Sequence, residues 1–171
     1  MGKRSNFERR KNDFYPTPQK AVRPLLPHLW SKNTWFYEPC SGTNDLINHL
    51  ESEGHTCIGN SDLEMDATTT QYNWKDLPQF DCFITNPPWT RNLLHPIIEN
   101  LRHQAPTWLL FDAGWMHTKQ AIPYLPFCQK IVSVGRVKWI PDTKYGSLDD
   151  SCWYLFIKEK TTTSFFGANS T

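Results

Sequence analysis

The sequence lacks several features that define whole classes of protein. Its cysteines form no Cys-x-x-Cys pair and its six histidines no pair at metal-ligand spacing, so no metal site is expected. No apolar run is long enough to cross a bilayer, and we recognise no secretory signal. The odd cysteine count then favours a reducing compartment, the cytoplasm or a cell that hosts a virus, with no membrane partner. Most of these thiols are expected to be buried: Cys40, Cys57, Cys82, Cys128 and Cys152.

Net charge is also nearly absent, at +1 for 171 residues, so no overall field attracts nucleic acid. The exception is the N-terminal arm, residues 1–13, whose first eleven residues hold a group of basic side chains opposed only by Glu8. Either the arm contacts DNA phosphates or it is a frayed polar segment, and both interpretations stay open. The basic residues are Lys3, Arg4, Arg9, Arg10 and Lys11.

The apolar pattern predicts one α/β domain over residues 14–160, followed by a flexible tail at 161–171. Pro24 and Pro27 shorten or kink a helix expected at 18–30. Further helices are expected after Asp45, over 91–104 and over 117–125. The predicted strands are 34–37, 56–59, 80–85, 107–111, 130–139 and 152–158. No helix separates the last two strands, so they should form an antiparallel hairpin beside a mostly parallel sheet.

Polar residues cluster where these strands end. In open parallel sheets, ligands bind beyond the carboxyl ends of the strands. Four such ends carry candidate site residues: Glu38–Asn44, Asp62, Asn86–Trp89 and Asp112. We expect them to share one edge of the sheet. For Asp112 a helix-capping role is the favoured interpretation.

The most informative of these segments is Asn86-Pro87-Pro88-Trp89. Two prolines fix the backbone, so the Asn86 amide oxygen and a proline carbonyl become preset hydrogen-bond acceptors. Two acceptors suit a planar NH2 group, and the indole of Trp89 offers a face for a base to stack on. The alternative is a structural turn with a core tryptophan.

This segment resembles the catalytic motif of S-adenosylmethionine-dependent DNA N6-adenine methyltransferases, (Asn/Asp/Ser)-Pro-Pro-(Tyr/Phe/Trp). Residues 38–45, Glu-Pro-Cys-Ser-Gly-Thr-Asn-Asp, resemble that family's cofactor loop, and Tyr15-Pro16-Thr17-Pro18 resembles its Tyr-x-Thr-Pro element. The resemblance implies a Rossmann-like class I methyltransferase fold with a seven-stranded sheet and a reversed final hairpin. It implies catalysis by residues 86–89 and a small solitary, phage-like enzyme. The implied cofactor-binding residues are Tyr15, Thr17, Pro18, Glu38, Pro39, Cys40, Ser41, Gly42, Asn44, Asp62, Asp66 and Asn86.

Asn44 departs from this pattern, because the family has a second glycine there. Asparagine tolerates a left-handed backbone better than other non-glycine residues, so the turn is expected to survive, but the side chain should narrow the approach of the cofactor. Asp62 is expected to hold the cofactor ribose, with a cap or turn role as the alternative and Glu64 and Asp66 as nearby substitutes. Asp66 is the candidate for the cofactor adenine.

The reaction implied is methyl transfer to the N6 amino group of adenine in DNA, which requires base flipping or a single strand. The chain has no room for a recognition domain, so we expect short or relaxed specificity, or a partner subunit. Residues 139–150, with Lys138 beside them, are the candidate DNA-contacting loop, or else a plain hairpin loop. Two alternatives remain: methylation of RNA or of a protein glutamine amide, and an inactive methyltransferase-like binding subunit.

Overall fold

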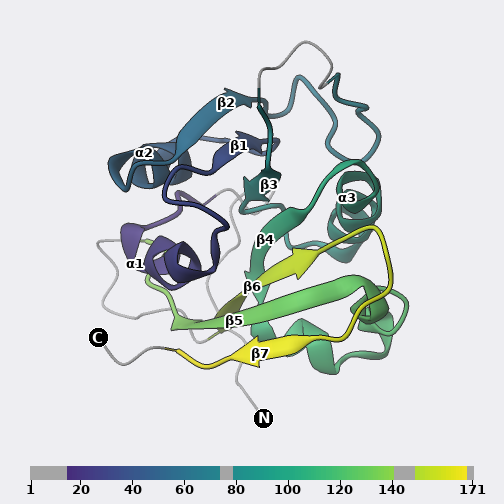
Figure 1. Cartoon of the computed structure of the whole chain (residues 1–171). Coiled ribbons are helices and arrows are strands. Elements are labelled where there is room, and N and C mark those ends of the chain that lie inside the picture. Colours follow the sequence, from purple (N-terminus) through teal and green to yellow (C-terminus); the bar gives the residue numbers. More distant parts are fainter. Residues whose placement is uncertain (1–14, 74–78, 141–148, 169–171) are drawn as a thin grey trace.

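A computed structural model of the chain describes residues 15–73, 79–140 and 149–168. The basic arm at 1–13 and most of the candidate DNA-contacting loop, residues 141–148, lie outside these ranges. Seven strands form a single sheet (Figure 1). They are β1 (Trp35–Glu38), β2 (Thr56–Asn60), β3 (Cys82–Thr85), β4 (Thr107–Asp112), β5 (Cys128–Arg136), β6 (Asp150–Phe156) and β7 (Ser164–Phe166).

The strand order across the sheet is β2-β1-β3-β4-β6-β5-β7. The pairs β2–β1, β1–β3, β3–β4 and β5–β7 are parallel, whereas β6 is antiparallel to both of its neighbours. Within the described sheet, β6 alone therefore runs against the other strands. The prediction of a mostly parallel α/β sheet that includes an antiparallel hairpin is confirmed.

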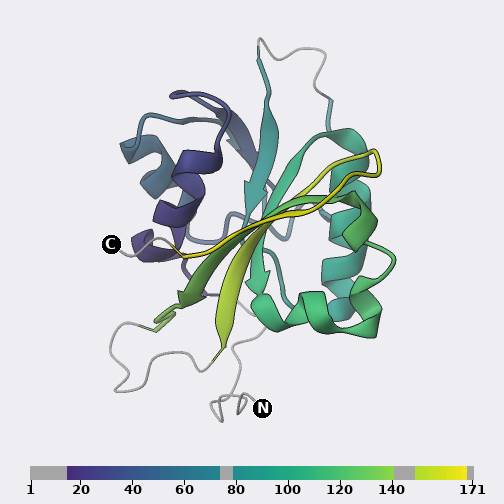
Figure 2. The same ribbon diagram turned by 60° about the horizontal axis from the view of Figure 1, so that its bottom comes forward.

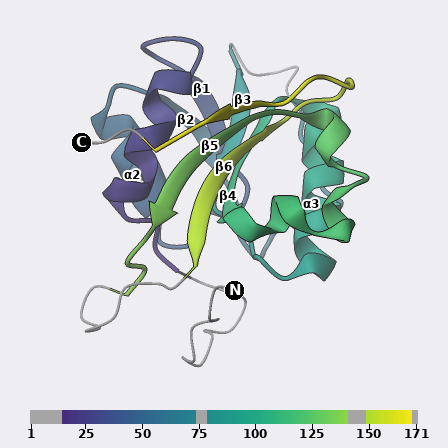
Figure 3. The same ribbon diagram turned by 90° about the horizontal axis from the view of Figure 1, so that it is seen from below.

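Helices cover both faces of this sheet (Figures 2 and 3). One face carries α1 (Gln19–Val22), the 3-10 helix η2 (Arg23–His28) and α2 (Asp45–Ser52). The other face carries α3 (Arg91–Gln104) and the 3-10 turns η3 (Ala113–His117), η4 (Lys119–Ala121) and η5 (Leu125–Phe127). Among the described residues, no helix is both long and apolar enough to span a bilayer.

Proline accounts for the form of two predicted helices. The helix at 18–30 is shortened as predicted, to four α-helical residues before η2, which includes Pro24 and Pro27. The expected helix at 117–125 is replaced by separate 3-10 turns. Pro123 and Pro126 lack the N–H that a continuing helix needs, so the chain turns instead of extending an α-helix.

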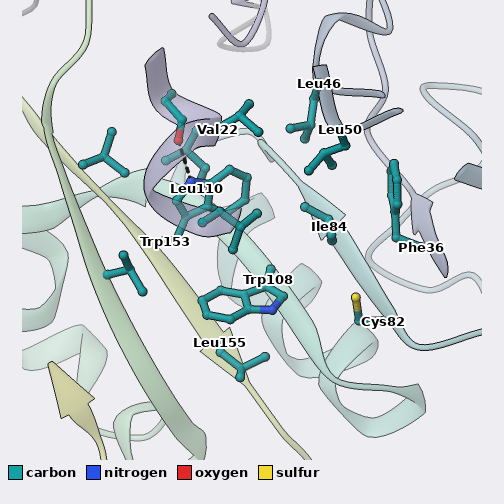
Figure 4. Packing of buried hydrophobic residues seen from close by; sticks show 14 of the residues in the cluster. Val22, Phe36, Leu46, Leu50, Cys82, Ile84, Trp108, Leu110, Trp153 and Leu155 are labelled. Carbon is teal, nitrogen blue, oxygen red and sulfur yellow. Dashed lines mark hydrogen bonds between the residues drawn. The ribbon is translucent and has the colours of Figure 1, made fainter. Parts of the chain in front are cut away.

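Strand residues alternate between two buried clusters, one on each side of the sheet. Trp108 and Leu110 of β4 and Trp153 of β6 pack toward α1 and α2 (Figure 4). Leu109 and Tyr154 face α3 instead. The Trp153 indole donates a 2.8 Å hydrogen bond to the Ala21 carbonyl, which fastens α1 to the sheet.

The C-terminal segment also differs from its prediction. A flexible tail was expected from residue 161, yet Ser164–Phe166 form β7, paired with β5 through Lys130, Ile131 and Val132. Thr163 Oγ1 donates a 2.7 Å bond to the Cys128 carbonyl just before the strand. The sequence pattern had located six strands, so this segment supplies the seventh.

Candidate functional site

A cavity of about 510 Å³ lies at the carboxyl ends of β1, β2 and β3. Its size falls in the range typical of small-molecule sites. Its walls come from the segments expected to converge there: the one before α1, the β1–α2 loop, the chain after β2 and the chain after β3. The convergence of these three strand ends is thus confirmed.

The β1–α2 loop turns sharply through two residues with left-handed backbone. Gly42 has φ 53°, and Asn44, at the N-cap position of α2 but without a side-chain capping bond, has φ 63°. Asparagine occupies this conformation at less cost than most side chains, so the turn is preserved without a second glycine. The Asn44 side chain is exposed and does not line the cavity, so the expected narrowing of the approach is wrong.

Glu38 lies at the cavity wall and is almost fully buried, with 1% of its surface exposed. Thr85 Oγ1 donates a long bond, 3.4 Å, to Glu38 Oε1, whereas Oε2 has no hydrogen-bond partner. Burial, with a smaller contribution from Asp62 and Asp45, raises the pKa of this carboxyl well above its usual range. A cationic donor in the cavity would satisfy Oε2 and favour the ionised form.

Two further carboxylates line the cavity on the chain after β2. Burial and the neighbouring Glu64 raise the pKa of Asp62. Asp66 instead accepts bonds from the backbone N–H and hydroxyl of Thr68, at 2.9 and 2.6 Å, which lower its pKa. Asp66 is therefore held in a local turn, while Asp62 lines the cavity.

Asn86, which follows β3 directly, is held by contacts on both ends of its amide. Nδ2 donates to Thr17 Oγ1 at 3.2 Å and to the Tyr15 carbonyl at 3.4 Å. Oδ1 accepts the indole N–H of Trp89 at 3.2 Å, and this N–H also lies 3.1 Å from the Leu110 carbonyl. The segment before α1 and the Asn-Pro-Pro-Trp loop therefore meet at one side chain.

Arg91 and Asp112 lie beside this loop. The guanidinium is 3.2 Å from Asp112 Oδ2 and donates to the Trp89 carbonyl at 3.4 Å. Asp112 Oδ1 accepts the N–H of Gly114 and caps η3. The capping role favoured for Asp112 is confirmed, and the ion pair ties the end of the loop to β4.

Most predicted site residues border the cavity, and four do not. The residues that line it are Tyr15, Thr17, Glu38, Pro39, Cys40, Ser41, Gly42, Asp62, Asp66, Asn86 and Pro88. The four that do not are Pro18, Asn44, Pro87 and Trp89. Burial raises the pKa of the Cys40 thiol to about 12, so this cysteine stays protonated. Within the described ranges, no group of three or more metal-binding side chains occurs.

Sequence reasoning missed several lining residues. Leu93 and Ile97 were expected only as the core face of α3, but both border the cavity. Leu63, Met65, Ala67 and Thr68 belong to a segment that the sequence pattern left irregular. Pro16, Thr43, Asp45 and Leu46 complete the set. The apolar members were not recognisable, because an apolar residue at a cavity and one in a core follow the same periodicity.

Solved structures with a similar fold are methyltransferases, which makes this a methyltransferase fold. One is a modification subunit assigned to a type I restriction enzyme from Vibrio vulnificus, with TM-score 0.56 and 10% identity over 92% of this chain and 48% of that one. A second is a type I restriction-modification methyltransferase subunit from Streptococcus thermophilus, with TM-score 0.55 and 9% identity over 88% and 46%. A third is the 23S rRNA methyltransferase ErmE, with TM-score 0.53 and 12% identity over 86% and 71%.

The chain spans about half the length of the two restriction-modification subunits. No family model and no curated protein matches the sequence. At these identities the likeness concerns the fold, so the chemistry must be argued from the residues of this chain.

Proposed function

We propose that this protein transfers the methyl group of S-adenosylmethionine to the N6 amino group of adenine in DNA. The observation that carries the proposal is the placement of Asn86. Its amide is fixed by Thr17, Tyr15 and Trp89 at the wall of a cavity that also contains the buried Glu38. A fixed amide oxygen beside a cofactor-sized cavity suits the binding of an exocyclic amino group.

The lining of the cavity fits the chemical groups of this cofactor. The unpartnered Oε2 of Glu38 would accept its ammonium group, and the Asp62 carboxylate would accept its ribose hydroxyls. The apolar side chains of Leu63, Leu93 and Ile97 suit a flat adenine ring. When bound, the cofactor supplies an electrophilic methyl group on a sulfonium.

The contribution of the chain is then positioning. Asn86 Oδ1 accepts a hydrogen from the target amino group, which orients the nitrogen and draws its lone pair toward the methyl group. Transfer of the methyl group would form an N–C bond in place of the S–C bond, and the amino group would release one proton to solvent. This route requires neither a side-chain base with a shifted pKa nor a metal.

Target recognition is proposed to depend on parts of the molecule outside the cavity. The basic arm at 1–13 and the loop at 139–150 are the proposed DNA contacts, and a partner subunit would supply sequence specificity. The likeness to two subunits of type I restriction systems supports a partner subunit. The likeness to an rRNA methyltransferase favours RNA as the second candidate substrate.

The test is methyl transfer from labelled S-adenosylmethionine to unmodified DNA and, in parallel, to RNA. The methylated nucleosides are identified by mass spectrometry. N6-methyladenine in DNA with the wild type, and at least 100-fold less with Asn86→Ala, is the expected result, because loss of a positioning contact costs about that much. Methylated nucleosides in RNA alone would make RNA, and not DNA, the substrate. Binding of the cofactor without methyl transfer to DNA or RNA would favour a protein substrate or a binding subunit.

A further inference from the structure

The indole N–H of Trp89 lies between two acceptors of the candidate active site. It is 3.2 Å from Asn86 Oδ1 and 3.1 Å from the Leu110 carbonyl of β4. An indole nitrogen can only donate, so its position defines which end of the Asn86 amide carries the oxygen. Trp89 is therefore bonded to the same atom that the proposed function assigns to the substrate.

The position of the NH2 group at the other end of the amide is also determined by its partners. The Tyr15 carbonyl can only accept, so the Asn86 atom 3.4 Å from it must be the NH2 group. That group also lies 3.2 Å from Thr17 Oγ1. Asn86 thus has the Trp89 N–H donor on its oxygen side and the Tyr15 carbonyl acceptor on its nitrogen side, and a half-turn of the amide would break both bonds.

The ring of Trp89 is used for packing. It is partly buried, contacts both core clusters and meets the ring of Trp139 edge-on, with centroids 5.6 Å apart at 87°. It does not line the cavity, whereas its neighbours Asn86 and Pro88 do. These contacts hold the indole in one orientation behind Asn86.

We propose that Trp89 is a positioning residue, whose N–H holds the Asn86 oxygen toward the substrate, a role separate from any stacking of its ring on the target base. The inference rests on the proposed function for its catalytic consequence, but not for its geometry. A carbonyl oxygen has two lone pairs, and the Trp89 N–H occupies one, which leaves the other for an amino group on the cavity side.

Trp89→Phe separates the two roles, because it keeps an aromatic face and removes the N–H. A stacking role predicts kcat within about twofold of the wild type. Positioning predicts a fall in kcat of roughly 10- to 100-fold, with the KM for S-adenosylmethionine within about twofold. Trp153→Phe is the matched control, because it removes a buried indole N–H bonded to a carbonyl outside the site, at 2.8 Å. It should leave kcat unchanged while lowering stability.

Asn86→Asp gives a second, independent variant. It tests the other end of the amide, because it places an acceptor oxygen where Nδ2 now donates to the Tyr15 carbonyl. kcat should fall at least tenfold although Asp occurs in the resembled motif, and full activity would show that the Tyr15 contact does not orient the side chain. Full activity of Trp89→Phe would overturn the positioning role.

A readout without activity keeps this inference separate from the proposed function. In assigned nitrogen–proton spectra of the wild type, the Trp89 indole N–H should exchange with solvent at least tenfold more slowly than that of the half-exposed Trp30. Equal exchange rates would contradict the hydrogen bond whatever the substrate proves to be. Slow exchange of the Trp89 indole N–H in a protein that transfers no methyl group would support the hydrogen bond and contradict only the proposed function.

Discussion

Glu38 is the residue whose electrostatic state depends most on what enters the cavity. Its carboxyl is buried, one oxygen has no partner, and its pKa is raised. With the folded pKa above the unfolded one, the protonated form contributes stability that is complete below the unfolded pKa, near 4.5. This contribution is lost as the pH rises from there through the folded pKa.

We therefore expect the cofactor-free wild type to lose free energy of unfolding above pH 4.5 more steeply than Glu38→Gln. Urea unfolding of both proteins between pH 4 and 8 measures the difference. The same variant should bind S-adenosylmethionine about tenfold more weakly, because a charge-assisted hydrogen bond is removed. Parallel stability curves would show that Glu38 ionises as freely in the folded chain as in the unfolded one.

At residue 44 the sequence predicted the backbone conformation correctly but not the direction of the side chain. The left-handed turn follows from the preference of asparagine, and Asn44 adopts it at φ 63°. The direction of the side chain depends on how α2 leaves the loop, which is a tertiary property. The sequence-based concern about cofactor access was wrong for that reason.

At the scale of elements, α3 shows what periodicity can predict. Its bounds, Arg91–Gln104, were predicted correctly, since the apolar spacing is regular from Leu93 to Leu101. The sequence pattern could not distinguish its residues that pack in the core from those that also line the cavity. Leu94 and Ile98 are fully buried in the core, whereas Leu93 and Ile97 also border the cavity. Only the position of the sheet distinguishes these two sides of the helix.

Strand β7 could not be predicted in this way, because three residues are too few to show a recognisable apolar periodicity. All three are exposed, so no alternation of apolar and polar residues signals the strand. Its order comes from pairing with β5 and from a ring contact between Phe166 and His28, with centroids 4.5 Å apart. The strand exists because a neighbour far away in sequence offers a free edge.

Truncation after Lys160 should consequently destabilise the protein, by about 2 kcal/mol for the lost bonds and ring contact. In thermal unfolding this corresponds to a fall in Tm of roughly 4–8 °C for a chain of this size. Exposure of the β5 edge should also promote self-association, measurable by light scattering. Truncation after Gly167 is the control and should change neither; an unchanged Tm in the longer truncation would mean that β7 contributes nothing.

For the whole molecule, the low net charge makes nucleic-acid binding depend on local groups. The arm carries five basic residues, so its removal should reduce DNA affinity and flatten the salt dependence. Each lost phosphate contact changes the slope of log K against log salt by about 0.9. Fluorescence anisotropy at several salt concentrations measures the DNA affinity of the full chain and of a variant that lacks residues 1–13. The affinity for S-adenosylmethionine, which should be the same in both, is the control. An identical slope in both proteins would assign the contacts to other surfaces.

The reversed direction of β6 has a consequence for how this fold can be extended. β5 ends at Arg136 opposite Asp150, where β6 begins, and Ser151 pairs with Asp112 at the end of β4. Both ends of the β5–β6 connection are thus anchored at the edge of the sheet that carries the cavity. Chain inserted there lengthens a closed loop at small entropic cost and leaves the strand pairs intact. A foreign sequence-reading module spliced between these strands would begin and end at the edge of the sheet that carries the cavity, which makes this connection the natural graft point on this fold.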